Sequence, residues 1–138
     1  MKSLLRNLIL FVVFGAIYFG LESAWEGCVT HWTMFLMGGF ISVVIGDING
    51  KVHWKTPILQ QITIGMGVAI FCDAAVGITI NILLRMEMWH YTRMAFLWDQ
   101  CSLPFCAIWF VLSAACIFLD DFLRWKLLGE EKPHYTLR

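Results

Sequence analysis

The sequence predicts an all-α polytopic membrane protein with about four transmembrane helices and a short amphipathic C-terminal extension. Its 138 residues are 59% hydrophobic and 14% charged, whereas about 25% of residues are charged in soluble domains. Four apolar runs approach the roughly 20 residues that one helix needs to cross a bilayer. The chain length leaves room for a single domain. The predicted spans are about 4–25, 32–46, 58–84 and 96–119, followed by a cytoplasmic tail over 120–138.

The first span resembles a signal peptide, because Lys2 and Arg6 precede an apolar run. The run is too long for a signal peptide, however, and it continues through Glu22 without a small-residue cleavage site. We therefore expect a retained first helix.

The remaining spans differ in length. The second, 32–46, is short, so it must extend into Ile48 or lie where the bilayer thins. The third is long and is expected to tilt. The fourth carries Pro104, which is expected to kink it because proline removes a helical hydrogen bond.

Lysine and arginine positions predict that both termini lie in the cytoplasm. Basic residues are concentrated in cytoplasmic loops of membrane proteins. Eight of the ten basic residues fall at the N-terminus, in the second loop or in the tail, and two fall in the third loop. The eight are Lys2, Arg6, Lys51, Lys55, Arg124, Lys126, Lys132 and Arg138, and the two are Arg85 and Arg93.

Small and polar residues recur at every fourth position of the third span. A step of four residues turns an α-helix about 40° past a full turn, so only neighbouring members of the row share one face. Small residues at this spacing allow two membrane helices to approach closely. The row is Gln61, Gly65, Ala69, Asp73, Gly77 and Asn81, and its tight face runs from Gly65 to Gly77.

The second span has a similar pattern. Its small residues are Gly38, Gly39, Ser42 and Gly46. We therefore expect the second and third helices to pack closely against each other.

Three carboxylates are predicted to lie at a similar depth, in the outer third of the membrane. Ionisable residues inside a bilayer are costly and commonly mark a pathway or a partner. This cluster, with polar residues near the same level, is the candidate site for a solute or an ion. The alternative is that these side chains only hold helices together through hydrogen bonds. The cluster comprises Glu22, Asp73 and Asp99, with His31, His90, Asn81 and Gln100 nearby.

Tryptophans mark the predicted ends of the spans. Such an aromatic belt is typical of membrane proteins, and the same rings around carboxylates could instead form a cage for an organic cation. The outer tryptophans are Trp25, Trp32, Trp89 and Trp98, and the inner ones are Trp54 and Trp125.

Several function classes lack support in the sequence. The formal net charge is zero, and we find no nucleic-acid motif, phosphate-binding loop, metal-ligand set or catalytic constellation. No enzyme activity, nucleic-acid partner or cofactor is therefore expected. Cys28 and Cys101 lie near the predicted outer face and could form a disulfide, but the sequence does not place them within bonding distance.

The tail alternates charged and apolar residues, as a helix does when it continues into the headgroup layer. We expect Asp120 and Asp121 to pair with Arg124 one turn later. Gly129 is expected to end this helix.

Several stretches resemble the family of small bacterial membrane proteins called ABC-transporter type IV or CmpB-like permeases. Departures occur at His90, Asp73, Asp99 and Gly50, where the family usually has other residues. The similar stretches are Leu21 to Gly27, Thr30 to Phe35 with Gly38 and Gly39, Gly46 with Asn49, Gly77 with Asn81, Trp89 to Thr92, Gln100 with Leu103 to Phe105 and Trp109, and Asp120 to Trp125 with Pro133 to Tyr135.

The resemblance implies a permease-like subunit in the bacterial cytoplasmic (inner) membrane. Because the chain has no nucleotide-binding motif, it also implies a separate ATP-binding subunit. Four helices make a thin wall, so a pore would need a homo-oligomer in the lipid bilayer. The competing hypotheses are a non-transporting membrane scaffold or assembly factor and an intramembrane enzyme that acts on a lipid.

Overall fold

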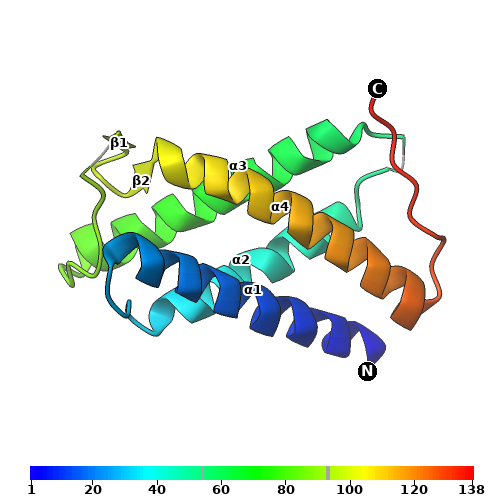
Figure 1. The fold of residues 1–138 in the computed structure, drawn as a ribbon, viewed down its shortest axis with the longest axis horizontal. Helices are drawn as coiled ribbons and strands as arrows, with labels where there is room; N and C mark the ends of the chain where they lie inside the picture. The colour runs from blue at the N-terminus through cyan, green and yellow to red at the C-terminus, as the bar shows by residue number, and fades with distance from the viewer. Residues whose placement is uncertain (54, 93) are drawn as a thin grey trace.

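The computed structural model describes residues 1–53, 55–92 and 94–138, and over these residues the chain is an all-α polytopic membrane protein (Figure 1). Three helical stretches are long and apolar enough to cross a membrane, and α2 is apolar but shorter, with 17 residues. The sequence-based placements of Trp54 and Arg93 lie outside the described residues. The elements are α1 (Lys2–Glu26), α2 (Thr33–Asn49), α3 (Ile58–Gly77), the π-helix η1 (Ile78–Leu83), β1 (Ala95–Phe96), β2 (Cys101–Ser102), α4 (Leu103–Leu123) and the π-helix η2 (Arg124–Leu128).

The helices run alternately up and down, so both termini lie at the same end of the bundle (Figure 1). We call this end the terminus end. The opposite end carries the connections 27–32 and 84–102, and we call it the loop end.

Glycine and proline set several helix boundaries. Gly27 (φ 72°) ends α1 and Gly129 (φ 74°) ends η2, both in the left-handed conformation that glycine adopts without steric cost. Pro57 precedes α3, and Pro104 lies in the first turn of α4. Proline suits a first turn because its missing N–H has no helical partner there.

The predicted start of the fourth span is wrong. The helix begins at Leu103 instead of near residue 96, and Ala95–Phe96 pairs with Cys101–Ser102 in a short antiparallel hairpin. Pro104 therefore starts α4 and does not kink it. The apolar run misled the prediction because hydropathy alone does not separate a helix from a folded connection at its end.

The glycines of α2 pack against α1, which corrects the expected α2–α3 packing. A Cβ at Gly38 would overlap the Cβ of Tyr18, and a Cβ at Gly39 would lie 2.7 Å from the carbonyl oxygen of Phe11. The Ser42 hydroxyl donates to the carbonyl of Leu10 at 3.1 Å. At Gly46 the neighbours are side chains of α1 and α4. Helices α2 and α3 also touch, but the closest backbone approach of α2 is to α1.

All six members of the α3 row are buried. At the middle of the row, a Cβ at Gly65 would lie 3.0 Å from the Ser113 Cβ, so this glycine lets α3 approach α4. A Cβ at Gly77 would lie 2.7 Å from Oε1 of Gln100 and 3.3 Å from the Trp89 ring. The row therefore packs against α4 at its centre and against the loop-end connection near Gly77.

The terminus end contains a buried ionic cluster, of which the sequence predicted only the pairing of Asp120 and Asp121 with Arg124; among the described ion pairs Arg124 meets Asp120 and not Asp121. Asp120 is fully buried and contacts Arg124 at 2.8 Å and Arg6 at 3.4 Å. Arg6 also pairs with Asp47, and Arg124 donates to the carbonyl of Gly46 at 3.0 Å. The cluster joins α1, α2, α4 and η2, so it holds the four elements in register.

The C-terminal tail is folded back against the same end of the bundle. The Tyr135 hydroxyl donates to Asp121 at 3.0 Å, and the backbone N–H of Ile58 donates to the carbonyl of Thr136 at 2.8 Å. The Tyr135 ring packs edge-on against Phe118 at 4.9 Å between centroids. Asp121, expected at the headgroup layer, is therefore a buried anchor for the tail.

Candidate functional site

Glu22 lies near the loop end of α1 and is almost completely buried, with 2% of its surface exposed. Two tyrosine hydroxyls donate to the same carboxylate oxygen: Tyr18 at 2.9 Å and Tyr91 at 3.0 Å. Tyr18 precedes Glu22 by one turn of α1, whereas Tyr91 comes from the connection between η1 and α4. The loop-end connection thus folds onto α1 through this carboxylate.

Asp73 supplies a second buried carboxylate, on α3. It is also 2% exposed, and it interacts electrostatically with Glu22 and with Tyr18. Its Oδ1 atom has no hydrogen-bond partner among the described residues. A buried carboxylate oxygen without a partner is costly unless it is neutral or meets a cation, a proton donor or water.

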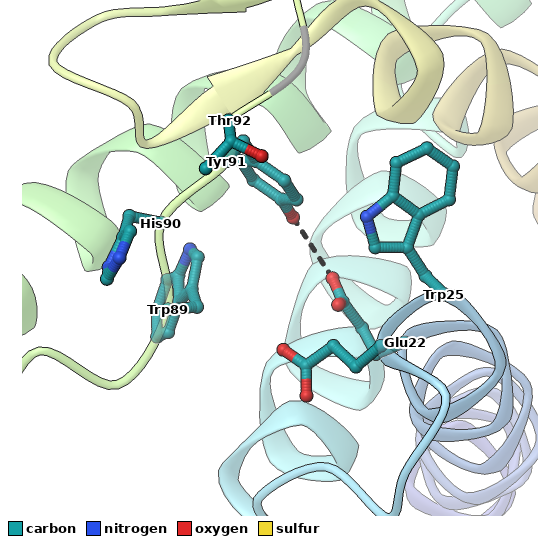
Figure 2. A pocket seen from close by; sticks show the side chains of 7 residues that line it. Glu22, Trp25, Trp89, His90, Tyr91 and Thr92 are labelled. Atoms are coloured by element: carbon teal, nitrogen blue, oxygen red, sulfur yellow. Dashed lines mark hydrogen bonds between the residues drawn. The ribbon is translucent and has the colours of Figure 1, made fainter.

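A pocket of about 500 Å³ opens at the loop end beside Glu22. Its volume falls within the range of about 300–1,000 Å³ that is typical of small-molecule sites. Figure 2 shows Trp25 on one side of the Tyr91–Glu22 hydrogen bond, and Trp89 and His90 on the other. The lining comprises Glu22, Trp25, Glu26, Trp89, His90, Tyr91 and Thr92.

The pocket is acidic and aromatic. Glu22 and Glu26 contribute carboxylates, and none of the described lining residues is Lys or Arg. The Phe105 ring supports two of the pocket's rings, with centroids 5.3 Å from Trp25 and 4.9 Å from Tyr91. Carboxylates beside tryptophan and tyrosine faces are chemistry that suits a cation.

Asn81 and Gln100 do not line this pocket, although the sequence analysis grouped them with the site. The Asn81 amide donates to Gln100 Oε1 at 2.6 Å and its oxygen accepts from the backbone N–H of Met88 at 2.7 Å. The Gln100 amide donates to the carbonyl of Trp98 at 2.9 Å. Both residues are buried. They fix the connection whose residues 89–91 line the pocket.

The Asp99 carboxylate was expected in the polar cluster, but it is not among the residues that line the pocket. Asp99 lies in the hairpin turn, has φ 62° and is exposed. Its backbone carbonyl, not its side chain, accepts a hydrogen bond from the backbone N–H of Tyr91 at 2.8 Å. The prediction failed because it placed this residue inside a helix that begins four residues later.

The two histidines separate in the structure. His90 is exposed and lines the pocket, whereas His31 is exposed in the connection between α1 and α2 and contacts Thr33 at 2.9 Å. His31 is not among the residues that line the pocket.

The tryptophans of the loop end also separate into exposed residues and residues that line the pocket. Trp32 and Trp98 are exposed at the loop end, where a belt residue is expected, and Trp25 is half-exposed at the rim of the pocket. Trp89 is buried, so its assignment to the belt is wrong. It packs into the bundle because Gly77 leaves room for its ring.

Tyr18, Tyr91 and Glu26 were not identified as site residues from the sequence. Burial, with the charges of Asp73 and Glu22, raises the pKa of the Tyr91 hydroxyl well above its ordinary value. The hydroxyl therefore stays protonated and remains a donor to Glu22. The spacing of Tyr18 and Glu22, one helical turn apart, was a usable signal for their pairing, but nothing local links Tyr91 to α1.

Cys28 and Cys101 are both free, and they differ in exposure: Cys28 is exposed and Cys101 is buried. Burial and the charge of Asp73 raise the pKa of the Cys101 thiol to about 12. Because the thiolate is the reactive form, we expect maleimide to label Cys28 at least about 100-fold faster than Cys101 in the folded protein. Peptide mapping of a labelling time course measures both rates. The Cys28→Ser variant should lose the fast phase, and equal rates at the two thiols would contradict the buried position of Cys101.

Comparisons with protein-family models, with curated proteins and with solved structures gave no match. The described residues also contain no group of three His, Cys, Asp or Glu side chains that could hold a metal ion.

Proposed function

We propose that this chain is a permease-like membrane subunit that binds a cation or a small cationic solute in the loop-end pocket, as part of a transport assembly. The observation that carries the proposal is the buried Glu22 carboxylate at the wall of an open pocket of about 500 Å³. Two fixed hydroxyl donors orient this carboxylate, and aromatic faces surround it. A cation entering the pocket would meet negative charge in a partly desolvated site, where ionic attraction is stronger than in water.

Asp73 gives the proposal a direction. Asp73 lies further from the loop end of the α3–η1 helix than Glu22 lies from the loop end of α1. It does not line the pocket, and its Oδ1 atom has no hydrogen-bond partner among the described residues. A cation or proton that leaves Glu22 for the bundle interior would meet this carboxylate next. Ionisable residues in such positions commonly serve transport pathways.

The orientation and the assembly complete the proposal. Eight basic residues in the terminal and second-loop segments favour a cytoplasmic terminus end in a bacterial inner membrane. The pocket would then open to the outer side. A separate ATP-binding subunit or a homo-oligomer would supply what a single four-helix chain lacks.

Binding is tested with tetramethylammonium on the purified protein in a non-ionic detergent. We expect saturable quenching of tryptophan fluorescence, confirmed by calorimetry, because Trp25 and Trp89 line the pocket. The Glu22→Gln variant should bind at least about tenfold more weakly, which corresponds to about 1.4 kcal/mol. Glu87→Gln is the matched control, since Glu87 is an exposed carboxylate of the same connection that does not line the pocket. Equal loss in both variants, or no binding by the wild type, would overturn the proposal.

Transport is tested separately in proteoliposomes with the Asp73→Asn variant. A transporter should lose uptake while the variant still folds, since Asn preserves the shape of the side chain. A scaffold whose polar row only joins helices should be indifferent to this change. Wild-type uptake by Asp73→Asn would remove Asp73 from the pathway.

A further inference from the structure

A second cavity adjoins the proposed site on the lipid-facing side of the bundle. It is an apolar groove of about 270 Å³ between α2 and the α3–η1 helix. The groove follows α2 from Met34 to Phe40, about 9 Å along the helix axis at 1.5 Å per residue. Its lining residues are Thr33, Met34, Leu36, Met37, Phe40, Val76, Ile80 and Trp89.

Trp89 belongs to both cavities. It lines the acidic pocket beside Glu22 and also lines the apolar groove. The residue is buried, with 6% of its surface exposed; Gly77 leaves room for its ring, and its backbone N–H donates to the Asn81 side-chain oxygen. A single buried side chain thus lines both the acidic pocket and the apolar groove.

We propose that the ligand of this site is an amphiphilic cation, with an ammonium headgroup in the carboxylate pocket and a hydrocarbon chain in the groove beside Trp89. The inference depends on the proposed cation site and names its substrate class. Charge complementarity selects the headgroup, because Glu22 and Glu26 line the pocket without a described basic residue. The shared residue Trp89 selects the hydrocarbon chain, because it brings the apolar groove next to the pocket for the headgroup.

The depth of the two cavities agrees with such a molecule. The pocket is at the loop end, where a headgroup meets water, and the groove runs inward along the first two turns of α2. A single-chain amine in a bilayer has the same polarity order. A small inorganic cation would use the pocket alone and would leave the groove without a role.

The test compares tetramethylammonium with butyl-, hexyl- and octyltrimethylammonium, using the full chain in lipid nanodiscs and subtracting binding to empty nanodiscs. The wild type should bind about fourfold more tightly for each methylene that enters the groove. Filling the groove with Val76→Phe should abolish this dependence on chain length and leave tetramethylammonium affinity within about twofold. Val111→Phe is the matched control, because Val111 faces outward on α4 and does not line the groove.

The outcomes separate this inference from the proposed function. Chain-length dependence that Val76→Phe removes and Val111→Phe retains supports the inference. If tetramethylammonium binding depends on Glu22 but the longer-chain ammonium ions bind no more tightly, the inference is overturned and the cation site stands. A gain with chain length that Val76→Phe does not change also overturns it, since the chain would then bind elsewhere. If no ammonium binding depends on Glu22, both the inference and the proposed function are overturned.

Discussion

Replacing Asp120 by alanine is expected to lower the free energy of unfolding by about 3–5 kcal/mol, the cost of removing one partner from a buried ion pair. Asp120 is fully buried and contacts two arginines, Arg6 and Arg124. Arg6 is itself 3% exposed, so its charge would lose a partner in a region of low dielectric. The measurement is the unfolding transition in mixed micelles, followed by far-ultraviolet circular dichroism.

Glu130→Ala is the matched control for this change. Glu130 pairs with the same arginine, Arg124, at 3.4 Å, but its side chain is exposed. Exposed ion pairs contribute about 0–1 kcal/mol, so the control should lie close to the wild type. Equal destabilisation by the two substitutions would show that burial does not set the strength of this cluster.

The second large effect is expected at Gly38, where α2 lies against α1. A Cβ at this position would overlap the Cβ of Tyr18 and lie 3.0 Å from the carbonyl oxygen of Phe14. These neighbours are backbone or near-backbone atoms, so the helices themselves would have to separate. Gly38→Ala should therefore cost about 1–3 kcal/mol, as overpacking does elsewhere, despite the better helix propensity of alanine.

Gly38→Ala should also weaken binding at the pocket, because Tyr18 donates to Glu22. We expect tetramethylammonium affinity to fall by at least about fivefold, or about 1 kcal/mol. Gly67→Ala is the control, since a Cβ at Gly67 would have no neighbour within 4 Å. It should unfold at or above the wild-type midpoint and bind normally. A stabilised Gly38→Ala protein would contradict the close approach of α1 and α2.

Gly38 and Gly65 illustrate what local sequence patterns reveal in a membrane protein. The four-residue spacing of small residues identified Gly38 and Gly65 as contact points, because close helix approach requires them. The spacing did not identify the partner helix. Gly38 packs against α1 and Gly65 packs against α4, and both partners are set by the arrangement of the whole bundle.

The candidate site shows the same division. The sequence indicated Glu22 and Asp73 because each is a carboxylate inside an apolar run, and a helix converts residue number into depth at about 1.5 Å per residue. The structure brings these two together and excludes Asp99, whose depth was inferred from a helix that does not extend so far. Only the folding of the 84–102 connection brings Tyr91 and Trp89 to the carboxylate.

The sequence alone determined the class of this protein and the approximate positions of its apolar helices, because apolar length and a low density of charge are properties of each segment by itself. Tertiary structure decided which faces meet, which polar side chains share a site and where the connection folds. Those outcomes depend on contacts such as Tyr91–Glu22 and Arg6–Asp120, which join residues 69 and 114 positions apart. Local periodicity carries no information about such pairs, since their energy exists only after the helices have packed.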